Sequence, residues 1–252
     1  MQTLHGLAAA NGLVTAFAIV GLALWLSYWL SRVLTRGRIH GSAIAIILGL
    51  LAAWWAGTVT GGTRGVADIT LLSGIGLMGG GMLRDFGIVA TAFGVRPGEL
   101  KKAGPVGALS ILVGVLVSFV VGAVVALAFG YRDAISITTI GAGAVTYIVG
   151  PVTGAAIGAS SEVLALSVAA GVVKAVVVMV ATPLVARSIG LNNPQSAMVF
   201  GGLMGTTSGV TGGLAATDPR LVPYGAMTAT FYTGLGCLLG PSLLYFAVRA
   251  VV

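Results

Sequence analysis

Long apolar stretches, separated by short segments that hold most of the charged residues, make up most of this chain. Each stretch approaches or exceeds the roughly 20 residues that a helix needs to cross the hydrocarbon core of a bilayer. The pattern therefore predicts an all-α polytopic membrane protein. The predicted spans are residues 11–34, 41–60, 67–83, 105–129, 161–187 and 223–248.

Two segments in the second half, residues 136–160 and 196–218, differ from ordinary spans because Gly, Ser and Thr are mixed with their apolar residues. The first also contains Pro151. Gly and Pro weaken or interrupt helices, so we expect broken or re-entrant helices there. If both segments cross, the chain has about eight membrane segments. If both return to the side they entered from, it has six spans and two hairpins.

The composition excludes an ordinary soluble domain. Charged residues make up 8% of the 252 residues, against roughly 25% in soluble domains, and the 40 glycines are more than twice the usual share of ~7%. Cys237 is the single cysteine, which excludes internal disulfides and thiolate metal clusters. His5 and His40 are too few and too far apart for a metal site. Enzyme motifs are absent, so the sequence predicts neither an enzyme nor a cofactor.

The basic residues lie beside spans, which explains the net charge of +7 without a nucleic-acid partner. Arg32, Arg36 and Arg38 crowd the loop at residues 31–40, and the segment 84–102 is also basic. By the positive-inside rule both are cytoplasmic. The sequence thus predicts a multi-pass protein of the bacterial inner membrane with a periplasmic N-terminus.

Glycines recur at every fourth residue in both Gly-rich segments, which is typical of closely packed membrane helices. The added Ser and Thr hydroxyls favour a binding site, because irregular backbone at membrane depth lines a cavity or is buried in protein. Half-helix N-termini attract anions and freed carbonyls coordinate cations. The candidate substrate-binding residues are Tyr147, Gly150, Thr153, Gly154, Lys174, Thr206, Thr207, Ser208 and Thr211. The candidate ion-binding residues are Thr146, Gly150, Gly209 and Asp218.

For two charged candidates, a purely structural role is the alternative to ligand binding. Lys174 lies near the middle of a predicted span, where a charge is costly and should face protein or water. It either binds an anion or is a structural or subunit-interface lysine. Asp218 precedes Pro219 and Arg220, so a local Asp–Arg pair at a helix end is the alternative to an ion site.

An internal repeat is suggested by the order of the elements, a Gly/Ser/Thr segment followed by an apolar span, which occurs twice. A shift of 58 residues aligns residues 152–154 with 210–212, and Pro183 with Pro241. If each Gly-rich segment is re-entrant, the two repeats are inverted relative to each other. If each crosses fully, they are parallel.

Four segments closely resemble the MadM family, the larger subunit of the bacterial malonate/sodium symporter. They are GRIHGSAIAI (37–46), GIGLMGGGMLRDFGIVATAF (74–93), SITTIGAGAVTYIVGPVTGAAIGASSEV (136–163) and GGLAATDPRLVPYGAMTATFYTGLGCLLGPS (212–242). The resemblance implies malonate uptake coupled to Na⁺, together with a smaller MadL-like membrane subunit. Whether H⁺ can substitute for Na⁺ stays open. A weaker, architectural likeness is to LrgB-type proteins.

We accordingly interpret residues 1–66 as a two-span scaffold that contacts the partner, and residues 67–252 as the transport core. Two alternatives remain open from the sequence. The chain is either a passive anion channel built from the same broken helices, or a structural membrane subunit whose partner carries the substrate site.

Overall fold

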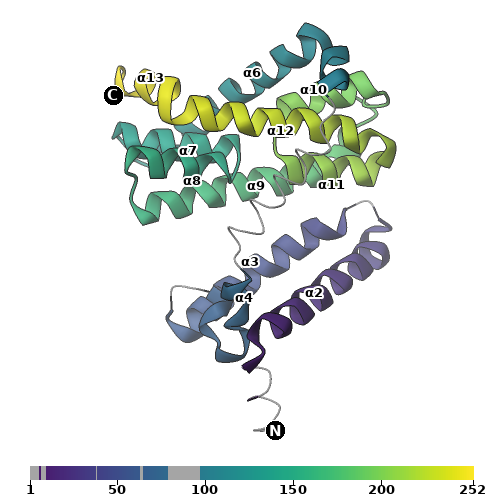
Figure 1. The fold of residues 1–252 in the computed structure, drawn as a ribbon, viewed down its shortest axis with the longest axis vertical. Coiled ribbons are helices and arrows are strands. Elements are labelled where there is room, and N and C mark those ends of the chain that lie inside the picture. The colour runs from purple at the N-terminus through teal and green to yellow at the C-terminus, as the bar shows by residue number, and fades with distance from the viewer. Residues whose placement is uncertain (1–5, 7–9, 38, 63–64, 79–96) are drawn as a thin grey trace. The chain divides into compact units, whose positions relative to one another are not determined.

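The computed structural model describes residue 6 and residues 10–37, 39–62, 65–78 and 97–252 (Figure 1). These residues form helices, turns and loops, and no strand occurs among them. The all-helical fold predicted from the sequence is therefore confirmed for this part of the chain. By its contacts the chain divides into two compact units, Met1–Ala90 and Thr91–Val252.

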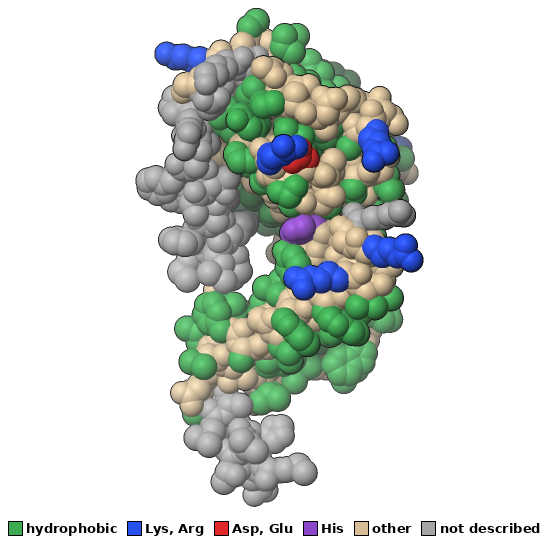
Figure 2. Space-filling model, turned by 90° about the vertical axis from the view of Figure 1, so that its right-hand side faces the viewer, with side chains coloured by type: hydrophobic (Ala, Val, Ile, Leu, Met, Phe, Trp, Pro, Cys, Tyr) green, Lys and Arg blue, Asp and Glu red, His purple; other side chains and the backbone are tan. Residues whose placement is uncertain are grey.

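Five helical segments are long and apolar enough to cross a membrane, and they confirm five of the predicted spans. They are Gly12–Thr35, Gly41–Thr60, Gly104–Ala128, Ser161–Val185 and Pro219–Arg249. Charged side chains occupy only a few places on the face in Figure 2, between hydrophobic side chains and uncharged or backbone atoms. This is the surface expected of a multi-pass membrane protein.

The first unit is built on two antiparallel apolar helices, α2 (Gly12–Thr35) and α3 (Gly41–Thr60). In the turn between them the Ser31 hydroxyl donates to the carbonyl of Ile39, and the His40 ring accepts from the backbone N–H of Ser42 at the start of α3. Burial lowers the pKa of His40. Hydrogen bonds made by residues of the loop itself therefore stabilise the turn between α2 and α3.

The predicted span at residues 67–83 is not a continuous helix where the structure describes it. Instead the chain forms two 3₁₀ turns, Gly65–Asp68 and Thr70–Leu72, and the short helix α4, Gly74–Leu77. The interruption lies at Ile69, whose backbone is extended between the two turns, with φ −78° and ψ 120°. Residues 79–83 and most of the predicted basic loop at 84–102 lie outside the described residues.

The second unit contains the two Gly-rich segments, and each is broken into two short helices. Their order is short helix, break, short helix, long helix, twice over. The elements are α6 (Pro97–Ala128), α7 (Ala134–Val145), α8 (Val149–Ile157), α9 (Ser161–Val185), α10 (Pro194–Met204), α11 (Thr207–Thr217), α12 (Val222–Leu239), a π-helical turn (Gly240–Leu244) and α13 (Tyr245–Arg249).

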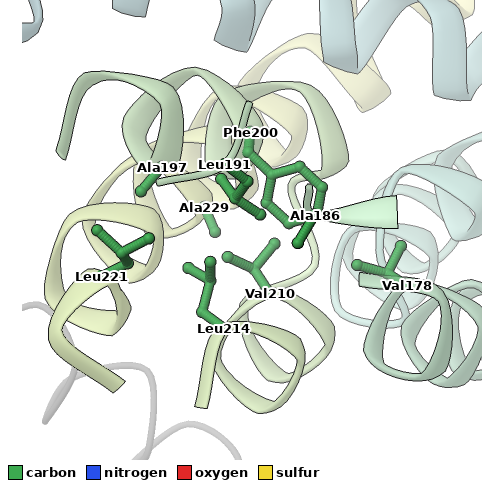
Figure 3. Close-up of a cluster of buried hydrophobic side chains, with 9 residues drawn as sticks. All are labelled: Val178, Ala186, Leu191, Ala197, Phe200, Val210, Leu214, Leu221 and Ala229. Atoms are coloured by element: carbon green, nitrogen blue, oxygen red, sulfur yellow. The ribbon is translucent and has the colours of Figure 1, made fainter. Parts of the chain in front are cut away.

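Each broken segment folds back so that its two ends share a hydrophobic cluster. Ile137, near the start of α7, packs in one cluster with Val163 of α9, and Ala159, just after α8, packs against it. In the second segment Ala197 of α10 and Leu214 of α11 lie in one cluster (Figure 3). Figure 1 shows α7 and α8 toward one end of α12, and α10 and α11 toward the other.

Candidate functional site

The first break, at residues 146–148, is held by a threonine. Asp133 caps the start of α7 by accepting from the N–H of Ser136 at 2.8 Å. At the end of α7 the backbone of Thr146 becomes extended, with φ −155° and ψ 158°. Its hydroxyl then accepts from the N–H groups of Ile148 and Val149, each at 3.2 Å. Thr146 therefore both ends α7 and caps the first N–H groups of α8.

The second break, at Gly205 and Thr206, depends on a glycine. Asn193 and Ser196 form a reciprocal cap at the start of α10. At its end Gly205 adopts a φ of 67°, a left-handed conformation that favours glycine. A Cβ at this position would also overlap the ring of Tyr232 in α12. The Thr206 hydroxyl is buried and, unlike that of Thr146, makes no hydrogen bond to the described part of the chain.

Lys174, in the middle of α9, lies inside this unit with its ammonium surrounded by neutral oxygens. Its Nζ donates to the Ser118 hydroxyl of α6, to the carbonyl of Val145 at the end of α7, and to the Tyr232 hydroxyl of α12, each at 2.9 Å. Tyr232 in turn donates to the carbonyl of Gly114 at 3.2 Å. Among the described residues no carboxylate forms a salt bridge with Lys174. Within the described part of the chain, the ammonium thus has hydrogen-bond partners but no counter-charge.

A second polar contact joins the two breaks directly. The Tyr147 hydroxyl, in the first break, donates to the Ser208 hydroxyl at the start of α11, at 3.4 Å. Because Lys174 also reaches the last carbonyl of α7, the first break contacts both α9 and α11. The structure therefore brings together Tyr147, Lys174 and Ser208, which were singled out from the sequence.

Other sequence candidates occupy different surroundings. Thr153 is fully buried in α8 beside Gly240, and its hydroxyl has no partner among the described residues. The Thr211 hydroxyl donates to the carbonyls of Thr207 and Ser208 in its own helix, at 2.8 and 3.2 Å. Gly150, Gly154 and Gly209 lie against neighbouring helices or side chains, where a Cβ would be too close. These residues therefore pack around the breaks and are not hydrogen-bond partners of Lys174.

Asp218 lies at the far end of α11 from the second break. Its carboxylate forms an ion pair with Arg220 at 2.9 Å, and hydrogen bonds from Arg220 hold the pKa of Asp218 below its ordinary value. It also caps the turn at Pro219–Leu221. The local Asp–Arg pair, which was the alternative offered by the sequence, is present in the structure.

We call Lys174 and its partners Ser118, Val145 and Tyr232, together with Tyr147 and Ser208, the polar cluster. Two of its residues, Ser118 and Tyr232, are not among the candidates singled out from the sequence. A signal for Ser118 exists, because small residues recur at every fourth position of its span: Ser110, Gly114, Ser118 and Gly122. Tyr232 follows Lys174 by 58 residues, the shift that gave the few matches between the suggested repeats. The spacing of the small residues indicates a packed face on α6, and the 58-residue shift would place Tyr232 on the face of α12 that corresponds to that of Lys174.

A pocket with a volume of about 770 Å³ lies elsewhere, between α9 and α10. Its lining is mainly aliphatic and includes Val177, Phe200 and Met204. A lining of this kind does not replace the water around a small charged ligand. The polar cluster at the breaks is therefore the better candidate for the functional site.

Comparison with known proteins adds one finding. A family model described as the malonate/sodium symporter MadM subunit matches residues 4–252, nearly the whole chain. No curated protein and no solved structure matches this chain.

Proposed function

This chain belongs to the MadM family of malonate/sodium symporter subunits, and we propose that it binds malonate between its two helix breaks, with Lys174 as the positive group. The family makes the chain a transporter subunit of the membrane and not an enzyme. The family match does not locate the substrate. The proposed position of the substrate is supported by the contacts within the second unit.

The observation that carries the proposal is an ammonium inside the second unit whose partners among the described residues are all neutral oxygens. Each of the three acceptors of Lys174 is a hydroxyl or a backbone carbonyl. A charge at this depth is costly and normally pairs with another group. Malonate is mainly a dianion near neutral pH, so the substrate itself supplies the missing counter-charge.

The two hairpins give the site its depth in the membrane. At 1.5 Å per residue, the 12 residues of α7 and the 11 of α10 extend about 18 and 16 Å, short of the ~30 Å hydrocarbon core. Because each segment folds back, we infer that both are re-entrant and that their tips lie near the midplane. Since the single span α9 joins them, they enter from opposite sides, as in transporters with inverted repeats.

Within this arrangement the candidate residues take different roles. Tyr147, Thr206, Thr207 and Ser208 lie at or beside the breaks, and we assign them to the substrate together with Lys174. The buried N-terminus of α11 adds N–H groups and a positive dipole end, which favour a carboxylate. Gly150, Thr153, Gly154 and Thr211 shape the surrounding packing. Among the candidate ion-binding residues, Gly209 packs on α9 and Asp218 is paired with Arg220. We therefore place the ion on the side of the first break, where α7 ends at Val145 and is followed by Thr146.

We further propose that the chain acts with a smaller MadL-like membrane subunit in the bacterial inner membrane. The first unit, with its two exposed apolar helices, would serve as the scaffold for that partner. The basic residues between α2 and α3 support a cytoplasmic position for this loop and a periplasmic N-terminus.

Counterflow of labelled malonate into proteoliposomes that contain both subunits tests the assignment of Lys174. We expect Lys174→Met to weaken the apparent malonate affinity about 10- to 100-fold, the range for losing a hydrogen bond to a charged group. Lys174→Arg should rescue only in part, because a guanidinium is larger and planar. Arg249→Met, which removes a charge at the end of α13, is the control and should bind malonate normally. Unchanged affinity in Lys174→Met, with the protein folded and inserted, would overturn the assignment.

A further inference from the structure

The oxygens around Lys174 form a set that suits a small hard cation. Three neutral oxygens accept from its ammonium, the Ser118 and Tyr232 hydroxyls and the Val145 carbonyl, and a fourth, the Gly114 carbonyl, accepts from the Tyr232 hydroxyl beside them. They come from α6, α7 and α12, so three helices converge on one position. We call these four groups the oxygen cage. No group of three His, Cys, Asp or Glu side chains occurs in the described part of the chain, which leaves neutral oxygen as the available ligand.

The chemistry of the oxygen cage favours a monovalent ion. Val145 is the last residue of α7, so its carbonyl lies at the negative end of a half-helix dipole. Carbonyls at the ends of broken helices coordinate Na⁺ in other transporters. An ammonium and Na⁺ carry the same charge and are both bound by such oxygens. The lysine therefore occupies a place that a sodium ion would also fit.

We propose that the oxygen cage is the sodium site of the symporter, and that the Lys174 ammonium fills it until Na⁺ displaces it. This inference rests on the proposed function, because the displaced ammonium then moves to the substrate. Na⁺ enters the cage, and the flexible lysine side chain turns toward the malonate carboxylate beside the breaks.

Charge balance explains why the two ligands bind together. Na⁺ alone would add a second positive charge to the site beside the ammonium. Malonate alone would bring two negative charges to a site whose single ammonium is still bound by the cage. With both bound, the charges of Na⁺ and Lys174 together match the two charges of malonate. Burying unbalanced charge in a low-dielectric interior is costly, so the doubly occupied state is favoured over either singly occupied state. Lys174 thereby couples the ion to the substrate.

The test measures binding of radioactive Na⁺ to the purified two-subunit complex, with and without malonate. In the wild-type complex malonate should raise the Na⁺ affinity by about 5- to 150-fold, the usual range of coupling between two sites. In Lys174→Met the competing ammonium is gone, so Na⁺ should bind more tightly without malonate, and malonate should no longer change the Na⁺ affinity.

Ser118→Ala and Tyr232→Phe each remove one cage oxygen and keep the shape of the side chain. Both should weaken Na⁺ binding, while malonate affinity at saturating Na⁺ stays near the wild-type value. Ser110→Ala is the matched control, since Ser110 lies two turns earlier on α6 and donates to Gly107 of its own helix. It should leave Na⁺ binding unchanged, and size-exclusion profiles of all variants check that they fold.

The outcomes separate this inference from the proposed function. If Lys174→Met loses malonate binding while Na⁺ affinity stays unchanged in all variants, the cage is not the sodium site but the substrate assignment stands. If Lys174→Met binds Na⁺ more tightly and malonate normally, the cage stands and the substrate assignment fails. Na⁺ binding that is unaffected in Ser118→Ala and in Tyr232→Phe would overturn the cage.

Discussion

At the residue scale, the second break depends on the absence of one side chain. Gly205 has a φ of 67°, and a Cβ there would overlap the ring of Tyr232. We expect Gly205→Ala to destabilise the protein, because a left-handed backbone costs a non-glycine residue about 1–3 kcal/mol before the clash is counted. A lower temperature of thermal unfolding in detergent would show the effect. Malonate transport should fall as well, since the ring that is pushed away carries the hydroxyl that contacts Lys174.

Gly234→Ala provides the matched control within α12. Gly234 is helical, and a Cβ there would meet nothing within 4 Å. Alanine in a helix is favoured over glycine, so this variant should unfold at the wild-type temperature or above it. If both variants unfold alike, the special conformation of Gly205 does not hold the break.

The residues of the site could be predicted only where they stand out from their surroundings. Lys174 was found because a charge in the middle of an apolar span has few ordinary explanations. Ser118 and Tyr232 were missed, since a serine or a tyrosine in a membrane helix is usual and only the fold shows which face it occupies. Thr211 was a candidate because it lies in a hydroxyl-rich segment, but its hydroxyl bonds to its own helix. Composition does not indicate where a hydroxyl points.

At the element scale, the sequence predicted that both Gly-rich segments are broken, because the residues that weaken a helix are local. It left open whether they cross or return, since that depends on contacts between residues far apart. The clusters around Ile137 and Ala197 supply those contacts. The repeat also becomes clearer at this scale. Asp133 with Ser136 and Asn193 with Ser196 form the same cap 60 residues apart.

If the first hairpin is re-entrant, as we propose, a direct topological consequence follows. Arg132, before α7, and Ser161, after α8, should lie on the same side of the membrane. In a Cys237→Ser background, Arg132→Cys and Ser161→Cys should both react with a membrane-impermeant maleimide in vesicles of one orientation. Neither should react in sealed vesicles of the other orientation.

Ser188→Cys is the control for this labelling, because the span α9 separates it from Ser161. It should react only in vesicles of the opposite orientation. If Arg132→Cys and Ser161→Cys label from opposite sides, the segment crosses the membrane. The repeats would then be parallel, and the two breaks would not meet as the tips of opposed hairpins.

At the scale of the whole molecule, the candidate functional site and the surface with exposed tryptophans belong to different units. The polar cluster lies entirely within the second unit, whereas α2 and α3 of the first unit expose tryptophans. Trp25 and Trp54 are 65% and 69% exposed, and Trp29 and Trp55 are also exposed. The interpretation of residues 1–66 as a scaffold that contacts the partner stays a prediction.

The exposed tryptophans lead to the last prediction, which concerns the smaller subunit. Tryptophan is enriched where a helix meets the membrane interface, but it is also a preferred residue at the centre of protein interfaces. A photo-crosslinking amino acid at Trp25 or Trp54 should capture the partner subunit in intact membranes. The same group at Val173 or Leu238 of the second unit, which are 61% and 71% exposed, serves as the comparison and should capture it weakly or not at all. If crosslinks to the partner arise only from positions after Ser136, the partner docks on the transport core, and the tryptophans of the first unit are anchors in the lipid interface.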